Sequence, residues 1–307
     1  MRIPMSPAIK LDQLQKTYKT PRGDVQALKG VSFEIQQGEF FGLLGPNGAG
    51  KSTLINILAG VTSKTGGSAS ILGVDIAKHP SQAKKLIGVV PQELSFDSWL
   101  KVEETIDFQT GYYGLPVDRA WRDELLKRLT LDDKRQQKPR GLSGGMKRRF
   151  MIARAMIHKP KILILDEPTA GVDVELRHEM YALLRELNAS GTTIVLTSHY
   201  LEEVELLCER VAIVNKGQLV ALDNKHALKD RFKSTRVFSI ALTEPLASAP
   251  PSLERFKPEL VDSELKLTFE EHEYKAVLKA VADANLPLAN FRVIEPTLED
   301  VFLSLTV

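Results

Sequence analysis

The chain has 307 residues, a length that allows one large domain with an appendage or two domains. Hydrophobic residues make up 43% and charged residues 26%, which is ordinary for a soluble globular protein, and the formal net charge of +2 excludes a chain-wide field for polyanions. The single cysteine, Cys208, excludes an internal disulfide framework and suits a reducing cytosol, where we expect it to be a buried structural thiol. No apolar run approaches the roughly 18 residues of a spanning helix, so we expect any membrane role to depend on a partner.

Three strands are predicted at the start of the chain. Residues 8–14 and 25–35 contain short alternating apolar stretches, broken by the turn signal Thr-Pro-Arg-Gly at 20–23. The apolar run at 40–44 predicts a buried strand, and residues 52–59 predict a helix. This strand and helix flank a glycine-rich segment.

That segment, residues 45–53, reads G-P-N-G-A-G-K-S-T and matches the phosphate-loop pattern G-x-x-x-x-G-K-[ST]. Its glycines allow a tight turn that directs backbone N–H groups inward, beside the positive end of the following helix. We expect Lys51 to reach the β- and γ-phosphates of a triphosphate, Ser52 to coordinate Mg²⁺, and Thr53 to bond on the α-phosphate side. A glycine-rich turn without a ligand is the alternative. The residues assigned to nucleotide binding are Gly45, Pro46, Asn47, Gly48, Ala49, Gly50, Lys51, Ser52 and Thr53.

Short strands and a helical insert follow. A turn over 62–68 precedes a strand over 69–72, and a strand over 87–90 ends at a proline. Residues 102–131 turn helical, in two segments separated by Gly-Leu-Pro at 114–116. We place this insert at about 98–141.

A further helix is predicted from Ser143, with one apolar stripe at positions 146, 150, 153 and 157. Ser143 can cap this helix, while Gly144 and Gly145 leave its N–H groups accessible to an anion. A plain N-cap is the alternative. Two copies packed head to tail would let each such helix start face the other's triphosphate. The basic triplet at 147–149 is expected to be a solvated face rather than a nucleic-acid contact.

Two carboxylates follow the next predicted strand, at 162–165. Ligands of open α/β sheets bind at this strand end, so Asp166 is expected to hold Mg²⁺, usually through water. Glu167 is expected to orient or deprotonate the attacking water. The alternative is that the pair caps the next helix.

The rest of the chain divides into two parts. A helix at 174–188, a strand at 193–196, a helix at 201–207 and a hairpin at 211–221 complete an α/β domain over 1–222, with a mainly parallel sheet buried on both faces. Residues 223–307 are predicted to form a small α+β extension. Its expected elements are a basic helix, a strand at 236–242, a loop at 248–258, a strand at 265–269, a helix at 272–284, a strand at 291–294 and a helix at 298–305.

These motifs together resemble those of the ATP-binding subunits of ABC transporters. The phosphate loop, L-S-G-G-M at 142–146, I-L-I-L-D-E-P at 162–168 and Ser-His at 198–199 occur in the order of that family, over roughly residues 8–222. The resemblance implies a P-loop ATPase domain with an antiparallel β subdomain and the helical insert. It also implies ATP and Mg²⁺ as ligands and ATP hydrolysis as the activity.

The resemblance assigns roles to four further residues. Gln92 resembles the loop glutamine that touches Mg²⁺ and senses the membrane partner, and Asp173 resembles the residue that links two subunits. His199 resembles the switch histidine that bonds the γ-phosphate, and Tyr18 the aromatic that stacks on adenine. Taken singly, Gln92 is any loop amide, Asp173 an N-cap and Tyr18 a packing residue.

The form L-S-G-G-M-K-R-R, the run A-G-V-D-V-E-L-R and the tail at 296–306 resemble the exporter branch, of multidrug and polysaccharide type, whose permease is a separate ABC-2 type membrane protein. Met146 stands where many relatives have glutamine and is assigned no role. The resemblance implies a homodimer under two permease chains, in the cytoplasm, peripheral on the inner face of the cell membrane, with no nucleic acid. Trp99, Tyr112 and Tyr113 are the candidate docking surface, with core packing as the alternative.

A second function class stays open. Some soluble ABC ATPases act on ribosomes or DNA, but these commonly carry two tandem ATPase units or long coiled-coil inserts, and this sequence has neither. Import and small-molecule kinase activity are further alternatives. The extension after 222 resembles one common in the exporter branch and is either regulatory, dimer-stabilising or a cap of the main domain. The transported substrate is not readable, since the permease holds its path.

Overall fold

The structure is a computed structural model that describes residues 6–21, 23–93, 99–170, 172–198, 200–231, 235–294 and 297–306. The chain forms two compact units, built mainly from Met1–Asn224 and from Lys225–Leu305. Among the helices of the described ranges, each is too short or too polar to span a bilayer.

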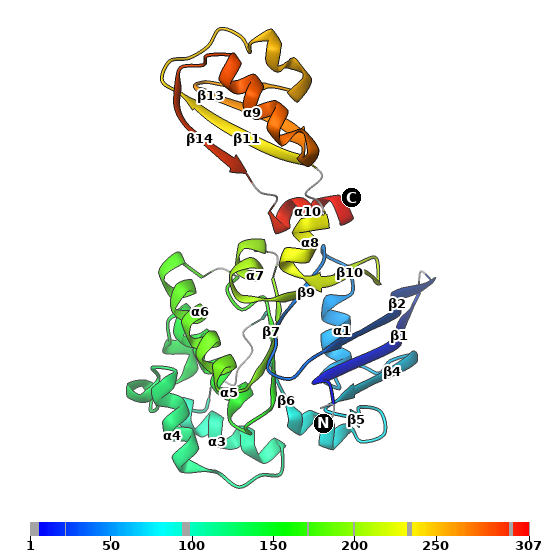
Figure 1. Cartoon of the computed structure of the whole chain (residues 1–307). Coiled ribbons are helices and arrows are strands. Elements are labelled where there is room, and N and C mark those ends of the chain that lie inside the picture. The colour runs from blue at the N-terminus through cyan, green and yellow to red at the C-terminus, as the bar shows by residue number, and fades with distance from the viewer. Residues whose placement is uncertain are drawn as a thin grey trace, which may run out of the picture. The chain divides into compact units, whose positions relative to one another are not determined.

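The first unit contains a mainly parallel six-stranded sheet in the order β10-β9-β3-β8-β7-β6. Four of these strands, β6, β7, β9 and β10, are labelled in Figure 1. Every pair is parallel except the hairpin of β9 with β10, as predicted. All five residues of β3 and of β8 are buried, because helices and a second sheet cover both faces. The strands are β3 (Phe40–Leu44), β6 (Ile87–Val90), β7 (Ile162–Asp166), β8 (Thr193–Thr197), β9 (Arg210–Asn215) and β10 (Gln218–Asn224).

The second sheet of this unit is antiparallel, in the order β2-β1-β4-β5. Its strands are β1 (Ile9–Thr20), β2 (Gly23–Ile35), β4 (Gly66–Ile71) and β5 (Val74–Asp75). β1 continues beyond the predicted end at residue 14, because it pairs with β2 as far as Thr20 and Gly23. This sheet is the antiparallel subdomain that the resemblance implies.

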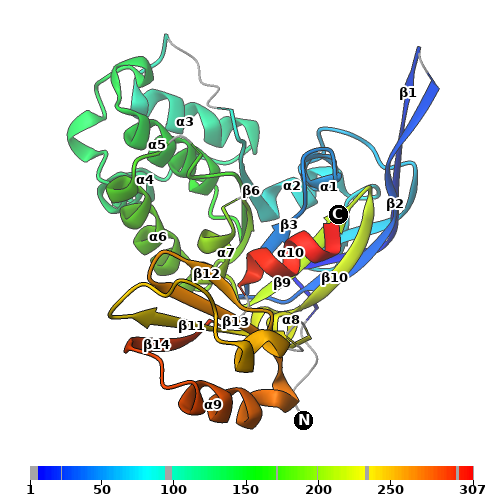
Figure 2. The same cartoon turned by 90° about the horizontal axis from the view of Figure 1, so that it is seen from above.

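Helix α1 (Lys51–Leu58) is packed between the two sheets. Leu54 and Ile57 share one buried cluster with Val31 of the antiparallel sheet and with Phe41 of the parallel sheet. Helices α5 (Gly144–Met156) and α6 (Val174–Ala189) cover the opposite face of the parallel sheet (Figure 2). The start of α1 is therefore fixed at the edge where β3 ends.

Two short helices complete the parallel region. α2 (Pro80–Leu86) precedes β6 and was not predicted, because only Ala83 of its seven residues is buried and no apolar period marks it. α7 (Leu201–Leu207) has its predicted bounds, and Cys208 directly after it is fully buried, as expected.

The helical insert has the two predicted helices, α3 (Val102–Tyr112) and α4 (Arg119–Arg128), followed by the 3₁₀ turns η1 (Asp132–Lys134) and η2 (Pro139–Gly141). Arg122 of α4 bonds Asp107 of α3 at 2.6 Å, which ties the two helices together.

The second unit is a four-stranded antiparallel sheet in the order β12-β13-β11-β14. Helix α9 and the 3₁₀ segment η3 share a buried cluster with one face of the sheet. η3 and β12 were not predicted, since the segment around them reads as a proline-rich loop. The elements are α8 (Lys225–Arg231), β11 (Thr235–Leu242), η3 (Pro251–Phe256), β12 (Glu259–Val261), β13 (Glu264–Glu270), η4 (Glu271–Glu273), α9 (Tyr274–Asp283), β14 (Leu288–Ile294) and α10 (Leu298–Thr306).

We expect Phe238→Ala to destabilise the second unit alone. Phe238 is 1% exposed at the centre of that core, and a buried Phe→Ala change costs about 3–5 kcal/mol. Both tryptophans, Trp99 and Trp121, belong to the first unit, so in urea tryptophan fluorescence follows that unit while far-UV circular dichroism follows both. The control is Phe291→Ala on edge strand β14, where Phe291 is 56% exposed. An equal shift of the fluorescence midpoint would show that the two units unfold as one.

Candidate functional site

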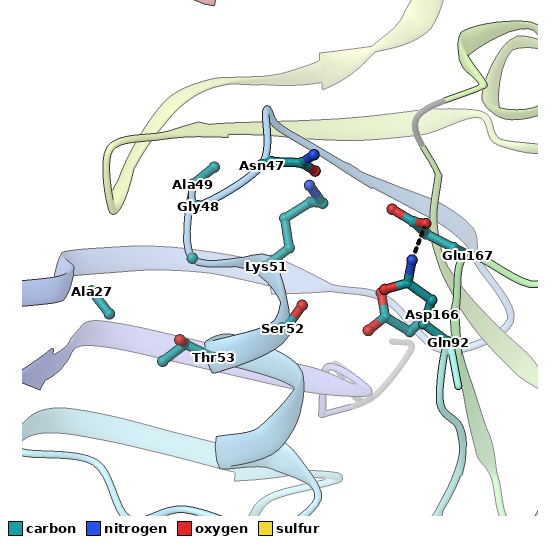
Figure 3. Close-up of a pocket in the computed structure, with 11 residues that line it drawn as sticks. Ala27, Asn47, Gly48, Ala49, Lys51, Ser52, Thr53, Gln92, Asp166 and Glu167 are labelled. Carbon is teal, nitrogen blue, oxygen red and sulfur yellow. Dashed lines mark hydrogen bonds between the residues drawn. The ribbon is translucent and has the colours of Figure 1, made fainter. Parts of the chain in front are cut away.

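A pocket of about 610 Å³ lies where β3 and β7 end in the parallel sheet. Lys51 and Ser52 lie on one side of it, and Gln92, Asp166 and Glu167 lie on the other (Figure 3). With Ala27 on β2, the pocket therefore brings together residues from four separate parts of the sequence. Its other lining residues are Ala27, Asn47, Gly48, Ala49, Gly50 and Thr53.

The phosphate loop depends on close backbone approach at two glycines. A Cβ added at Gly45 would lie 2.3 Å from the carbonyl oxygen of Val214. Gly50, the N-cap of α1, has φ +107°, a left-handed backbone conformation that residues with a side chain rarely adopt. Gly45 and Pro46 are not among the residues that line the pocket, and their carbonyl oxygens accept hydrogen bonds from Lys51.

Lys51 is buried at the base of the loop, with 7% of its surface exposed. Its Nζ donates to the carbonyl oxygens of Gly45 at 2.6 Å and Pro46 at 3.3 Å. Burial lowers the pKa of this ammonium group, against the opposing effect of Glu167 and Asp166. A desolvated cation held by weak neutral acceptors is well suited to an anionic ligand.

The two carboxylates after β7 are held by the neighbouring elements. Asp166 Oδ1 accepts a hydrogen bond from Thr197 Oγ1 at 2.5 Å. Glu167 has φ +49°, and its N–H bonds the carbonyl of Thr197 at 3.0 Å. Gln92 Nε2 donates to Glu167 Oε2 at 2.7 Å, and this bond links the loop after β6 to the turn after β7 (Figure 3). The alternative that the carboxylates cap a helix is not what the structure has, because Asp173 caps α6.

The donor set fits a hard divalent cation. Ser52 supplies a hydroxyl, Gln92 an amide and Asp166 a carboxylate, all oxygen ligands of the kind that Mg²⁺ prefers when substrate phosphates and water fill its remaining positions. In the described ranges no three His, Cys, Asp or Glu side chains gather as a metal cluster, so phosphates would have to complete this site.

A second pocket, of about 340 Å³, collects the segment at 142–146 and the loop before α6. Ser143 accepts a hydrogen bond from the N–H of Met146 and caps α5, as predicted. Asp173 accepts from the N–H of Leu176 at 2.9 Å, so the N-cap interpretation of Asp173 is confirmed. Both side chains, with Gly144 and Gly145, line this second pocket.

The expectation of a solvated face at 147–149 is wrong for Arg148, which is 3% exposed. Its guanidinium donates to backbone carbonyls of two loops on the side of the first pocket that carries Gln92 and Glu167. The neighbouring Arg149 bonds Thr130 and Glu179. The apolar period of α5 did not predict this burial, because backbone carbonyls meet Arg148 on the polar side of the helix.

Two residues with predicted roles need separate mention. Tyr18 lies on β1 opposite Val25, half-buried beneath the ammonium group of Lys16 at 4.7 Å, and Ala27 of the paired strand lines the pocket instead. His199 lies outside the described residues. Ser198 before it donates to Glu203 at 2.6 Å.

Glu203 is a buried carboxylate that sequence reasoning did not single out. It is 1% exposed and accepts hydrogen bonds from Ser198 and from Thr169, at 2.6 and 3.0 Å. Burial raises its pKa. Glu203 thereby joins the segment after β7 to the segment after β8. Nothing in the apolar pattern of α7 signals this role.

The three candidate docking residues differ in exposure and packing. Trp99 is 79% exposed and Tyr112 73% exposed, whereas Tyr113 stacks on His158 with ring centroids 3.8 Å apart. The packing alternative therefore holds for Tyr113. Tyr112 also borders an apolar groove of about 590 Å³ at the end of α3.

The chain is similar in sequence to a known protein family and to known ATP-binding proteins. The family described as ABC transporter matches residues 28–170. The chain is 36% identical to the linearmycin resistance ATP-binding protein LnrL of Bacillus subtilis, covering 97% of this chain and 98% of that protein. It is also 36% identical to the Nod factor export ATP-binding protein I of Rhizobium etli, covering 97% and 93%.

The chain is also similar to solved structures of an ABC transporter cassette. The dimeric structure of MJ0796, a bacterial ABC transporter cassette, has a TM-score of 0.64 and 30% identity, covering 70% of this chain and 98% of the other. A dimeric structure of MJ0796 in a post-hydrolysis state bound to ADP and Pi has a TM-score of 0.63 and 29% identity, with the same coverage.

We expect Gly45→Ala to destabilise the nucleotide-free protein by about 1–3 kcal/mol, because its Cβ would overlap the backbone of Val214. Thermal unfolding measures the loss. Gly144→Ala is the control, since an added Cβ there meets no heavy atom within 4 Å. An unchanged melting temperature for Gly45→Ala would show that the loop has room to shift.

Proposed function

The chain belongs to the ABC transporter family and is an ATPase of that family, and we propose that it energises export through a separate ABC-2 type membrane permease. One observation carries the ATPase part: the phosphate loop, Gln92 and the two carboxylates after β7 line a single pocket. Relatives named for linearmycin resistance and Nod factor export support the export part. The substrate class is left open.

In this proposal, hydrolysis depends mostly on positioning and on neutralising charge. Lys51 turns from its own loop carbonyls to the β- and γ-phosphates of ATP, and the backbone N–H groups that the phosphate loop offers donate to the same phosphates. Glu167, oriented by Gln92, directs the attacking water and accepts its proton. Mg²⁺, held by Ser52, Gln92 and Asp166, would neutralise the developing phosphate charge. His199 and Tyr18 keep their proposed contacts with the γ-phosphate and adenine.

We propose that two copies form the working ATPase. The helix start at Ser143 to Gly145 directs backbone N–H groups outward at a pocket that Asp173 also lines. In a head-to-tail dimer this start would meet the partner's ATP. Moving a permease from mostly one state to mostly the other needs about 5.5 kcal/mol of differential binding, which two interfacial nucleotides are well placed to supply. The dimeric cassette structure of MJ0796 supports this arrangement.

The permease is proposed to dock on the helical insert. Phe108, Tyr112, Leu115 and Val117 form an apolar groove at the end of α3 and are all exposed. Apolar surface gathered in this way is typical of a protein contact. Docking there would keep the chain peripheral, on the cytoplasmic face of the membrane. A nucleic-acid partner is not part of the proposal.

We expect Glu167→Gln to abolish turnover but keep ATP binding. The carboxamide keeps an acceptor for Gln92 and loses the base, so phosphate release should fall about 100-fold or more. Size-exclusion chromatography with ATP should then find a trapped dimer. Glu186→Gln, at an exposed position of α6, is the control. Wild-type turnover in Glu167→Gln would remove Glu167 from the role of base.

We expect Phe108→Glu to reduce permease recovery. As a single substitution in the isolated subunit, it should leave the ATPase rate unchanged. Recovery is measured in the Glu167→Gln background, by affinity purification with Mg-ATP from solubilised membranes followed by mass spectrometry. Phe291→Glu is the matched control, since the two phenylalanines are 59% and 56% exposed. Equal permease recovery from both would place docking elsewhere. Recovery of ribosomes or DNA instead would favour a soluble, non-transport ATPase.

A further inference from the structure

A buried arginine on α5 bonds both loops that carry the residues assigned to hydrolysis. Arg148 Nε donates to the carbonyl of Pro168 at 2.6 Å, and Nη1 donates to the carbonyls of Pro91 at 2.9 Å and Gln92 at 3.3 Å. Nη2 donates to the carbonyl of Glu167. One side chain therefore holds the backbone of the loop after β6 and of the turn after β7.

Burying a guanidinium away from water costs free energy, so it destabilises the fold unless its N–H groups find acceptors. Burial lowers the pKa of Arg148, against the opposing effect of Asp166, Glu203 and Glu167, yet an arginine remains protonated in proteins. Its planar fork donates in fixed directions, so it sets the relative positions of the carbonyls it binds. A lysine ammonium, a point donor, does not reproduce that geometry.

We propose that Arg148 is a positioning residue for hydrolysis, holding the Gln92 loop and the Glu167 turn at the spacing that their 2.7 Å side-chain hydrogen bond requires. It also fastens both loops to α5, the helix whose start at Ser143 is assigned to the partner's nucleotide. Arg148 acts through Gln92 and Glu167, so the inference rests on the roles proposed for them above.

The test is Arg148→Met, with ATPase kinetics and melting temperature measured on the full chain. We expect kcat to fall by about tenfold or more and KM for ATP to stay within about threefold, because Lys51 and the phosphate loop are untouched. The matched control is Arg154→Met. Arg154 is another α5 guanidinium whose pKa burial lowers, and it donates to Gln109 at 3.3 Å, away from both loops.

The proposal is overturned if Arg148→Met keeps wild-type kcat, if KM rises as much as kcat falls, or if Arg154→Met loses as much activity. If the methionine variant does not fold, Arg148→Lys, which keeps the charge, takes its place in the comparison of kcat and KM with the wild-type chain. We expect the lysine variant to recover stability but not kcat; full recovery of kcat would show that charge alone suffices.

A double-mutant cycle with Gln92→Ala separates positioning from general damage. Residues that act through one another give a combined loss smaller than the product of the single losses, whereas independent effects multiply. A multiplied loss would overturn the proposal. Failure of the proposed function is recognised separately: if Glu167→Gln keeps wild-type turnover, the assignment of the base fails whatever Arg148→Met does.

Discussion

The register of the parallel sheet is the constraint on which the site depends. β3 pairs with β8 and β8 pairs with β7 so that Leu43, Thr197 and Asp166 stand in one row across three strands. The phosphate loop begins just beyond that row on β3, and Glu167 follows it on β7. Because parallel strands end at the same edge, this one alignment brings an anion-binding loop and two carboxylates to opposite sides of a pocket. A slip of one residue would turn Asp166 to the other face.

Behind the pocket, buried polar side chains hold the loops in place. Thr197 bonds Asp166, Arg148 bonds the carbonyls around Gln92 and Glu167, and Glu203 bonds the segments after β7 and β8. A buried polar group left without a partner costs free energy, so each of these groups favours one arrangement of the loops over its alternatives. The loops at the sheet edge are therefore held by the interior of the protein, while their functional side chains face the pocket.

How far the sequence predicted this structure differs from element to element. The strand at 40–44 and the helix at 201–207 have their predicted bounds, and β7 is one residue longer than predicted, because short apolar runs with clear breakers allow few alternatives. α2 left no apolar period to detect, and η3 lies inside a proline-rich segment. The pattern G-x-x-x-x-G-K-[ST] named the loop residues of the pocket, but Ala27 came from a distant strand pairing. Arg148 was misjudged, since a helical period separates apolar from polar residues and does not tell whether the polar side meets water or backbone carbonyls.

Helix α5 connects these observations, because its start and a residue in its first half have different roles. Its start, capped by Ser143, lines the pocket shared with Asp173, and five residues later Arg148 binds the loops of the hydrolysis site. At about 1.5 Å of rise per residue, the two points are about 7.5 Å apart along a rigid helix. If the start of α5 contacts a nucleotide held by a second copy, a shift of that contact moves Arg148 with it, and Arg148 moves the backbone of Gln92 and Glu167. A buried, hydrogen-bonded connection of this kind would make each site sensitive to whether the other is filled.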